Sequence, residues 1–257
     1  MSRIVWDAVG EHTYETGVDH GVLYQLGTGT NDKGKYVNGV AWNGLTSVSE
    51  SPSGAEAQKQ YADNMNYLTL YSAEEFGATI EAFTYPVEFE QNDGSASPVT
   101  GLTVGQQPRK SFGLAYRTKV GNDTEGDDFG YKLHLVYGCR ASPSERGYST
   151  INDSPEAITF SWEITTTPVQ ISGFEPSAQL IIDSTKLDQE GKAKLVLLES
   201  ILFGRDQITG TGTGAGDAGT AVTPTLPLPD DVIHILKGDT GYTTMDDIIT
   251  KVVPASA

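Results

Sequence analysis

The sequence predicts a mainly β protein of the α+β kind, a β-sandwich or barrel with one flanking α-helix and a C-terminal extension. Apolar and polar residues alternate with a period of two through most of the first 185 residues, which is typical of strands with one buried face. The 29 glycines and 12 tyrosines favour turns and strands over helices. A helical apolar pattern appears only after these segments, in residues 188–204.

The strands are expected where the alternation is bounded by turn residues. It is clearest in residues 112–120, 131–137 and 158–164. Weaker alternation predicts further strands at 21–26, 36–48, 67–71, 77–85 and 179–183. About eight strands with antiparallel patterning indicate a sandwich or barrel.

Three connections differ in length and charge. Residues 50–64 and 91–110 are polar and longer than the roughly 2 to 6 residues of most connections, so we expect them to contact another molecule. The acidic stretch 122–128 resembles a calcium loop only in composition. Placing Gly126 sixth puts Lys132 in the twelfth position, where calcium loops need a carboxylate, so a solvated hairpin connection is expected.

The helix at 188–204 has an apolar face that includes Leu195, Leu198 and Leu202. Asp188 is placed to cap its start and Gly204 to end it. The first domain is therefore assigned to residues 1–205.

The C-terminal region is expected to be an extension of that domain. Residues 206–229, rich in Gly and Thr and then in Pro, predict a flexible linker, and residues 230–257 an arm with short helices at 230–237 and 244–253. Thr244 and Asp247 imitate a capping box. The arm's apolar face needs a docking site, for which another subunit is one candidate; it consists of Ile248, Ile249, Val252 and Val253.

The charge balance disfavours nucleic acid as a bound ligand. The chain has 34 acidic and 17 basic residues, a formal net charge of -17. Tight binding to phosphates needs clustered Lys and Arg. Cys139 is the only cysteine, so no intramolecular disulfide is possible and folding in a cytoplasm is expected. No signal peptide or membrane segment is expected either.

No catalytic, cofactor or metal site is expected. The four histidines are scattered, and the alternation places His134 on the polar face of its strand, as a surface residue. Cys139 is interpreted as a small core residue. Residues 214–219 have the spacing G-x-G-x-x-G, but they follow a helix and run into prolines, so they belong to the linker.

The tryptophans raise an alternative function. Trp162 lies on the apolar side of its strand and is expected in the core, whereas Trp6 and Trp42 lie beside turns and stay open. Exposed tryptophans on a β-domain suit a secreted carbohydrate-binding or adhesin module, which is the alternative we retain. A hydrolytic enzyme ranks third, because the chain shows no acid/base or metal set.

Several segments resemble the major tail protein, or tail tube subunit, of long non-contractile-tailed bacteriophages, of the type found in phages of Gram-positive hosts. Together they cover most of residues 4 to 170. They are residues 5–24 (VWDAVGEHTYETGVDHGVLY), 39–56 (GVAWNGLTSVSESPSGAE), 61–94 (YADNMNYLTLYSAEEFGATIEAFTYPVEFEQNDG), 105–138 (GQQPRKSFGLAYRTKVGNDTEGDDFGYKLHLVYG) and 151–169 (INDSPEAITFSWEITTTPV).

The resemblance implies a β-sandwich with a flanking helix that assembles into hexameric rings, stacked into a hollow tube through which the genome passes. Its implied location is the phage tail, assembled in the bacterial host cytoplasm. The implied partners are copies of this chain, the tape measure protein, the tail terminator and the distal tail proteins, with no membrane. DNA would pass through the lumen without specific binding, and an acidic wall suits that passage.

Candidate contact residues follow from this resemblance and from the alternation. The inter-ring candidates, taken from the first long loop, are Glu50, Ser51, Pro52, Glu56, Tyr61 and Asp63. Charged residues on or beside the polar faces of strands are candidates for the lumen or for contacts between subunits. The acids are Glu81, Asp128 and Glu163, and Arg117 and Lys119 are their expected basic partners.

Overall fold

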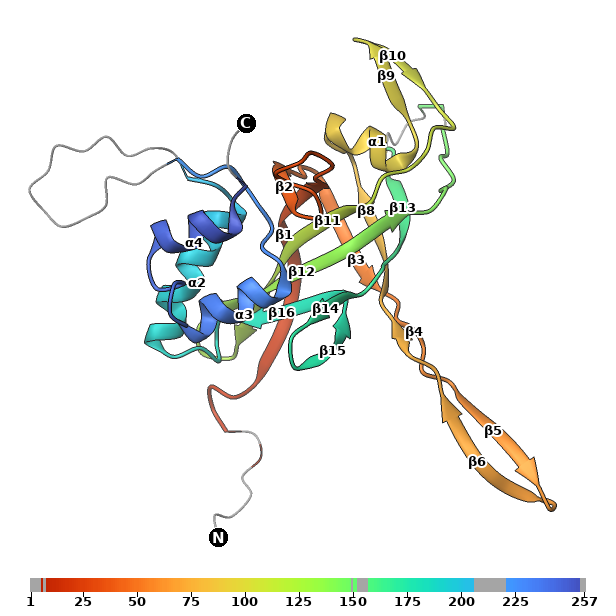
Figure 1. Cartoon of the computed structure of the whole chain (residues 1–257), viewed down its shortest axis with the longest axis vertical. Helices are drawn as coiled ribbons and strands as arrows, with labels where there is room; N and C mark the ends of the chain where they lie inside the picture. The colour runs from red at the N-terminus through yellow and green to blue at the C-terminus, as the bar shows by residue number, and fades with distance from the viewer. Residues whose placement is uncertain (1–5, 7, 149, 152–156, 206–220, 255–257) are drawn as a thin grey trace, which may run out of the picture.

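The computed structural model describes residues 6, 8–148, 150–151, 157–205 and 221–254. Its body is an antiparallel β structure with the strand order β2-β1-β11-β12-β13-β8-β3, and β16 pairs with β12 as well (Figure 1). The strands are β1 (Thr13–Leu26), β2 (Tyr36–Ala41), β3 (Leu45–Glu50), β8 (Gly77–Ala82), β11 (Phe112–Asn122), β12 (Gly126–Ala141), β13 (Phe160–Thr165) and β16 (Gln179–Asp183). The prediction of a mainly β fold is confirmed.

The strands form two packed sheets because β12 takes part in both. Most of β12 pairs with β11, whereas its last residues, Arg140 and Ala141, pair with β13. We call β2-β1-β11-β12-β16 the large sheet and β13-β8-β3 the small sheet. Leu114 of the large sheet shares one buried cluster with Ile80 and Ile164 of the small sheet, so the two sheets pack face to face.

Aromatic rings fill the space between the sheets. Trp162 is fully buried, as predicted, and its ring lies 5.6 Å from that of Trp42 and 5.2 Å from that of Phe89. Phe89 comes from a short 3-10 turn, η1 (Val87–Phe89), that leads into α1 (Glu90–Asp93). Trp42 is therefore a core residue.

Three helices cover the other face of the large sheet (Figure 1): α2 (Gln189–Leu202), α3 (Pro229–Lys237) and α4 (Met245–Val252). Leu133 and Leu135 of β12 pack in one buried cluster with Leu198, Ile235 and Ile248, one from each helix. The large sheet is thus buried on both faces. The expectation of one flanking helix understated this layer.

The helix ends follow the sequence closely. The side chain of Asp188 accepts a 2.7 Å hydrogen bond from the backbone N–H of Gly191. The hydroxyl of Thr244 accepts one from the backbone N–H of Asp247 at 3.3 Å. Such bonds satisfy N–H groups that have no partner in the first turn of a helix.

The C-terminal region is part of the domain rather than an arm. Residues 206–220, most of the expected linker, lie outside the described residues. Beyond them, the N–H of Leu226 donates to the carbonyl of Tyr36 at 3.0 Å, and the N–H of Gly39 donates to the carbonyl of Pro224 at 2.9 Å. The segment thereby covers the outer edge of β2. Its prolines favour an extended backbone, which suits this pairing better than a free linker.

Docking of the last helix occurs on the chain itself. Ile248 and Val252 are buried in the core beneath α2 and α3, and Ile249 and Val253 are half-buried against the same cluster. The apolar face of α4 therefore packs within this chain, in the cluster that the large sheet forms with α2 and α3.

Three hairpins lie outside the two sheets (Figure 1). The longest combines β4 (Ser53–Gly54) with β7 (Glu74–Glu75) and β5 (Ala57–Ala62) with β6 (Met65–Tyr71). A second joins β9 (Ala96–Val99) to β10 (Leu102–Val104), and a third joins β14 (Val169–Ile171) to β15 (Phe174–Ser177). Most of residues 50–64 thus lie in a hairpin rather than a loop, and residues 91–110 contain the end of α1 and the second hairpin, followed by an irregular segment at 105–110. In the part of the chain that is described, no helix has the length and apolar character to cross a membrane.

Candidate functional site

The feature that stands out is the long hairpin, residues 51–76, which extends far from the body (Figure 1). Its two-residue tip, Asp63 and Asn64, has positive φ angles of 50° and 63°, as a tight hairpin turn requires. Large apolar side chains are exposed along it. Tyr61 is 70% exposed and Leu70 55% exposed. An exposed apolar surface of this kind is typical of a protein interaction site.

The long hairpin has two chemically different faces. Residues that oppose each other in an antiparallel pair lie on the same face. Leu68 opposes Gln60 and Leu70 opposes Gln58, so the two leucines share one face. Tyr71, opposite Ala57, lies on the other face.

Most predicted inter-ring residues lie on this hairpin. Ser51, Pro52, Glu56, Tyr61 and Asp63 are all exposed on it. The exposed apolar side chains of the return strand β6 were not among the predicted contact residues. The unusual density of Tyr and Leu in residues 67–71 was the available signal.

Glu50, the remaining inter-ring candidate, is exposed but also makes contacts within the chain through its carboxylate. The hydroxyl of Tyr116 donates to Glu50 Oε1 at 2.7 Å, and the side-chain amide of Gln179 donates to the same oxygen at 2.8 Å. Glu50 is the last residue of β3, directly before the hairpin. The contacts therefore attach the base of the long hairpin to the large sheet.

Glu50, Tyr116 and Gln179 form an anchor for the long hairpin, and His134 completes it. His134 is buried, contrary to the expectation of a surface residue. It is only 6% exposed, and its ring stacks on Tyr116 with centroids 4.6 Å apart and an interplanar angle of 7°. Nδ1 lies 3.4 Å from Glu50 Oε1, and Nε2 is 3.1 Å from the hydroxyl of Thr118. Alternation placed His134 correctly opposite the apolar residues of β12, but that side of the strand is covered as well.

Burial shifts the acid–base behaviour of the anchor. It lowers the pKa of His134, and the nearby carboxylates of Glu50 and Glu15 only partly oppose this effect. Burial, followed by the hydrogen bond to Glu50, raises the pKa of Tyr116 above its ordinary range. At neutral pH the phenol is therefore a proton donor to a carboxylate, which is a strong type of hydrogen bond.

The short hairpin, residues 95–107, is the second projecting element. Its exposed apolar residues are Val99, Leu102 and Val104. Asp93, at the end of α1, holds its base. This buried carboxylate forms an ion pair with Arg146 and lies 3.9 Å from Arg109.

The outer face of the small sheet is polar and acidic. Glu81 and Glu163 point away from the core, since their neighbours Ile80, Trp162 and Ile164 point into it. The other side chains on this face are small and hydroxylated: Ser47, Ser49, Thr79, Ser161 and Thr165. Ser47 donates a 2.9 Å hydrogen bond to Glu81.

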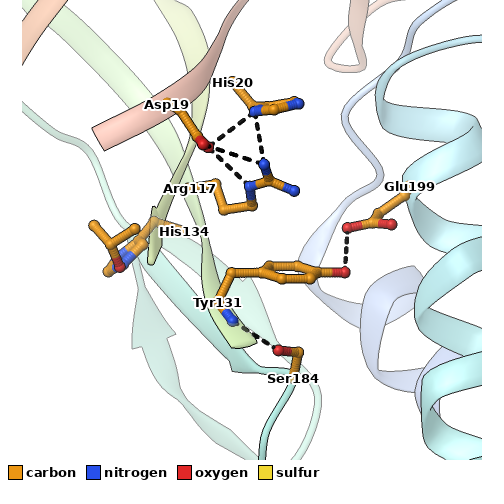
Figure 2. Close-up of polar contacts among 8 residues, drawn as sticks. Asp19, His20, Arg117, Tyr131, His134, Ser184 and Glu199 are labelled. Atoms are coloured by element: carbon orange, nitrogen blue, oxygen red, sulfur yellow. Dashed lines mark hydrogen bonds and ion pairs between the residues drawn. The ribbon is translucent and has the colours of Figure 1, made fainter. Parts of the chain in front are cut away.

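Arg117 does not pair with these acids. It lies on the helix-covered side of the large sheet, where its guanidinium donates to both carboxylate oxygens of Asp19 at 2.8 and 3.2 Å (Figure 2). Its positive charge also lies 4.8 Å above the ring of Tyr131. Within the chain Arg117 therefore pairs with Asp19 and not with Glu81 or Glu163, because alternation alone cannot tell which of two covered faces a residue occupies.

This charge network joins the large sheet to α2. The hydroxyl of Tyr131 donates a 2.6 Å hydrogen bond to Glu199, and the ring nitrogen of His20 lies 3.0 Å from the Arg117 guanidinium (Figure 2). Burial acts to raise the pKa of Asp19, but the hydrogen bonds from Arg117 and His20 outweigh it and the pKa is lowered. These contacts are structural.

The remaining charge candidates lie apart from the small sheet. Lys119 is exposed two residues beyond Arg117 on β11, and Asp128 is exposed near the start of β12. The turn between these strands is a hairpin connection, as predicted. In it, the side-chain oxygen of Asn122 accepts hydrogen bonds from the backbone N–H groups of Thr124 and Glu125.

The described residues show little reactive chemistry. Among them, no group of three or more His, Cys, Asp or Glu side chains is arranged to hold a metal ion. Cys139 is buried, as predicted, and burial raises the pKa of its thiol, which keeps it protonated. Trp6 is 76% exposed, whereas Trp42 is in the core.

A comparison with models of protein families finds no match, and a comparison with curated proteins finds none either. Among solved structures, the chain is similar to one chain of "Cryo-EM structure of the anti-feeding prophage (AFP) baseplate, 6-fold symmetrised". The two share 8% sequence identity over 72% of this chain and 100% of that chain, with a TM-score of 0.33. A similarity this distant carries no functional argument.

Proposed function

We propose that this chain is a structural, non-enzymatic subunit of a phage tail tube, which self-assembles into hexameric rings that stack into a conduit for the genome. The resemblance of residues 4–170 to major tail proteins supports this proposal. The same resemblance supplies the proposed partners: the tape measure protein, the tail terminator and the distal tail proteins. The fold, a β-sandwich with a helix layer on one side, is the one that the resemblance implies.

The observation that carries the proposal is the uncovered long hairpin. A two-stranded ribbon is marginally stable in water by itself. Tyr61, Tyr67 and Leu70 remain exposed on it, and the ribbon stands away from the rest of the described chain. Packing against neighbouring copies would remove this apolar surface from water and hold the ribbon in place.

The small sheet supplies a surface that suits the lumen. Its outer face presents Glu81 and Glu163 among serines and threonines, and the one basic residue that borders it among the described strands is Arg140 of β12, opposite Thr165. DNA carries about one charge per 1.7 Å, and an acidic wall repels it within about 8 Å at physiological salt. The edge strand β3 pairs with β8 on one side among the described strands, which leaves an edge for a neighbouring copy to cover.

The carbohydrate-binding alternative loses one of its two candidate residues. Trp42 is buried between the sheets, with its ring nitrogen donating to the carbonyl of Thr84 at 3.1 Å, so it is not available to stack on a sugar. Trp6 is the exposed tryptophan that a glycan-binding screen would still address.

The proposal is tested by measuring assembly of hairpin variants. Replacing Leu68 and Leu70 by Asp should give soluble subunits that no longer form rings or tubes, measured by light scattering coupled to size-exclusion chromatography. The matched control is Val196→Asp, since Val196 is equally apolar and 60% exposed but lies on α2. The control should assemble as the wild type does. Unimpaired assembly of the hairpin variant, with both proteins folded, contradicts the role of the long hairpin, and a folded wild-type chain that forms neither rings nor tubes contradicts the proposed function.

A further inference from the structure

The outer parts of the two projecting hairpins carry no net charge, although the base of the long hairpin holds Glu56, Glu74 and Glu75. The whole protein has a net charge of -17. The outer part of the long hairpin, residues 57–71, contains one basic residue, Lys59, and one acidic residue, Asp63. Residues 94–108, which include the short hairpin, contain no Asp, Glu, Lys or Arg.

Each hairpin also has one aliphatic face. Leu68 and Leu70 lie two residues apart on β6 and so point to the same side. Leu102 and Val104 do the same on β10, and Val99, directly opposite Leu102, joins them. The three residues of the short hairpin are exposed, Val99 to 64%. Two aliphatic ribbon faces of this kind can pack on each other as sheets do.

The two faces lie at opposite ends of the molecule. With the longest axis vertical, the β5–β6 ribbon reaches one end and the β9–β10 hairpin the other (Figure 1). A contact between them therefore cannot form within one chain. Between two copies it would be a head-to-tail contact, which can repeat from copy to copy and extend an assembly along that axis when the rotation between copies does not close a ring.

We propose that the leucine face of the β5–β6 ribbon packs on the Val99, Leu102 and Val104 face of the short hairpin of a second copy. This inference rests on the proposed function, in which it is the contact that joins one ring to the next. The charge distribution favours a second copy as the partner. Two chains that each carry -17 repel one another through most surfaces, and these two elements allow close approach without placing like charges together.

The anchors described above fit this role. Tyr116 and Gln179 hold Glu50 at the base of the long hairpin, and Arg146 and Arg109 surround Asp93 at the base of the short one. Both ribbons therefore leave the body from a fixed point, which lowers the entropy lost when they pack together.

Cysteine cross-linking tests the contact directly. In tubes assembled from a chain with both Leu70→Cys and Leu102→Cys, oxidation should link each copy to the next and give a ladder of oligomers on non-reducing gels. The control with Leu70→Cys and Val196→Cys should give no ladder. The native Cys139 is buried and serves as an internal control for thiol accessibility.

A charge-reversal pair gives a second, independent measurement. Leu70→Glu or Leu102→Lys alone should raise the protein concentration needed for elongation by about tenfold or more, a loss of about 1.4 kcal/mol per tenfold change. Combining both changes should recover most of that loss. Tubes that form but show neither the ladder nor the recovery overturn this contact and leave the proposed function intact. A wild-type chain that never self-associates overturns both.

Discussion

The phenol of Tyr116 donates a 2.7 Å hydrogen bond to the carboxylate of Glu50, and this bond connects the middle of the large sheet to the base of the long hairpin. The two residues are separated by 66 positions in the sequence. Their contact converts a flexible connection into a projection with a defined starting direction. Assembly through the hairpin therefore depends on a residue pair that lies outside the assembly surface itself.

Tyr116→Phe removes this hydrogen bond while keeping the ring that stacks on His134. We expect a loss of about 1 to 2 kcal/mol in the free energy of unfolding, because the bond is to a charged acceptor in a partly buried place. Amide exchange should also quicken at Ser51, whose N–H donates to the carbonyl of Gly77 beside the anchor. Urea unfolding and hydrogen exchange measure the two effects.

The control for this variant is Tyr14→Phe. The hydroxyl of Tyr14 donates to Asp127 at 2.9 Å, but the pair is exposed, so the expected loss in the free energy of unfolding is clearly smaller than that of Tyr116→Phe. Equal losses of unfolding free energy in the two variants would show that the Tyr116–Glu50 hydrogen bond stabilises the fold no more than an exposed one does.

Acidification should weaken the fold through His134. Its folded pKa is lowered by burial below the ordinary value of 6.5, whereas in the unfolded chain the ring takes up a proton near 6.5. The unfolded state therefore gains protons first as the pH falls, and stability decreases from about pH 6.5 down to the folded pKa. Glu50, Glu15 and Lys132 act on the same ring, and their combined effect does not reverse the shift.

His134→Gln removes this dependence while keeping a polar side chain. Urea unfolding at pH 7.5 and 5.5 should show a smaller difference in stability for the variant than for the wild type. An NMR titration of the wild type should give a pKa for His134 below that of an exposed histidine. An elevated pKa for His134 would reverse the sign of the effect and contradict this account.

Shortening the buried side chain of Ile248 in α4 should destabilise the whole domain. Ile248 is fully buried in the core, so Ile248→Ala is expected to cost about 2 to 4 kcal/mol. The neighbouring Ile249 is half-buried, and Ile249→Ala should cost clearly less. Thermal or urea unfolding compares the two. Similar small losses would indicate that the C-terminal helix is the separate arm first expected from the sequence.

Reversing charge on the small sheet should make the assembled tube retain DNA. With Glu81→Lys and Glu163→Lys, each subunit presents two cations where the proposed lumen has acids. Assembled tubes should then bind DNA at low salt and release it as salt rises, because the binding is electrostatic. Co-sedimentation with labelled DNA measures this. Glu190→Lys on the exposed side of α2 is the control, and equal retention by that variant would argue against a lumenal small sheet.

The sequence was most informative where the core decides the structure. Alternation located the strands around Leu114, Leu133 and Trp162, because those side chains must be buried. The helix starts at Asp188 and Thr244 could also be predicted from the sequence, because a capping hydrogen bond joins residues only a few positions apart.

The hairpins and anchors were harder to predict because their determinants lie far apart in the chain or in another copy. The strand Ala57–Ala62 is polar and, among the described strands, pairs with β6 alone, so it shows no pattern of burial. His134 and Arg117 lie on faces that are covered by distant elements. The pairing of Leu226 with Tyr36 joins residues 190 positions apart, which no local pattern reveals.

Electron microscopy of the purified full-length chain tests the central claim most directly. We expect rings of sixfold symmetry and stacked tubes of uniform bore at high protein concentration. A protein that remains strictly monomeric at high concentration, while folded, would contradict the assignment as a self-assembling tail tube subunit.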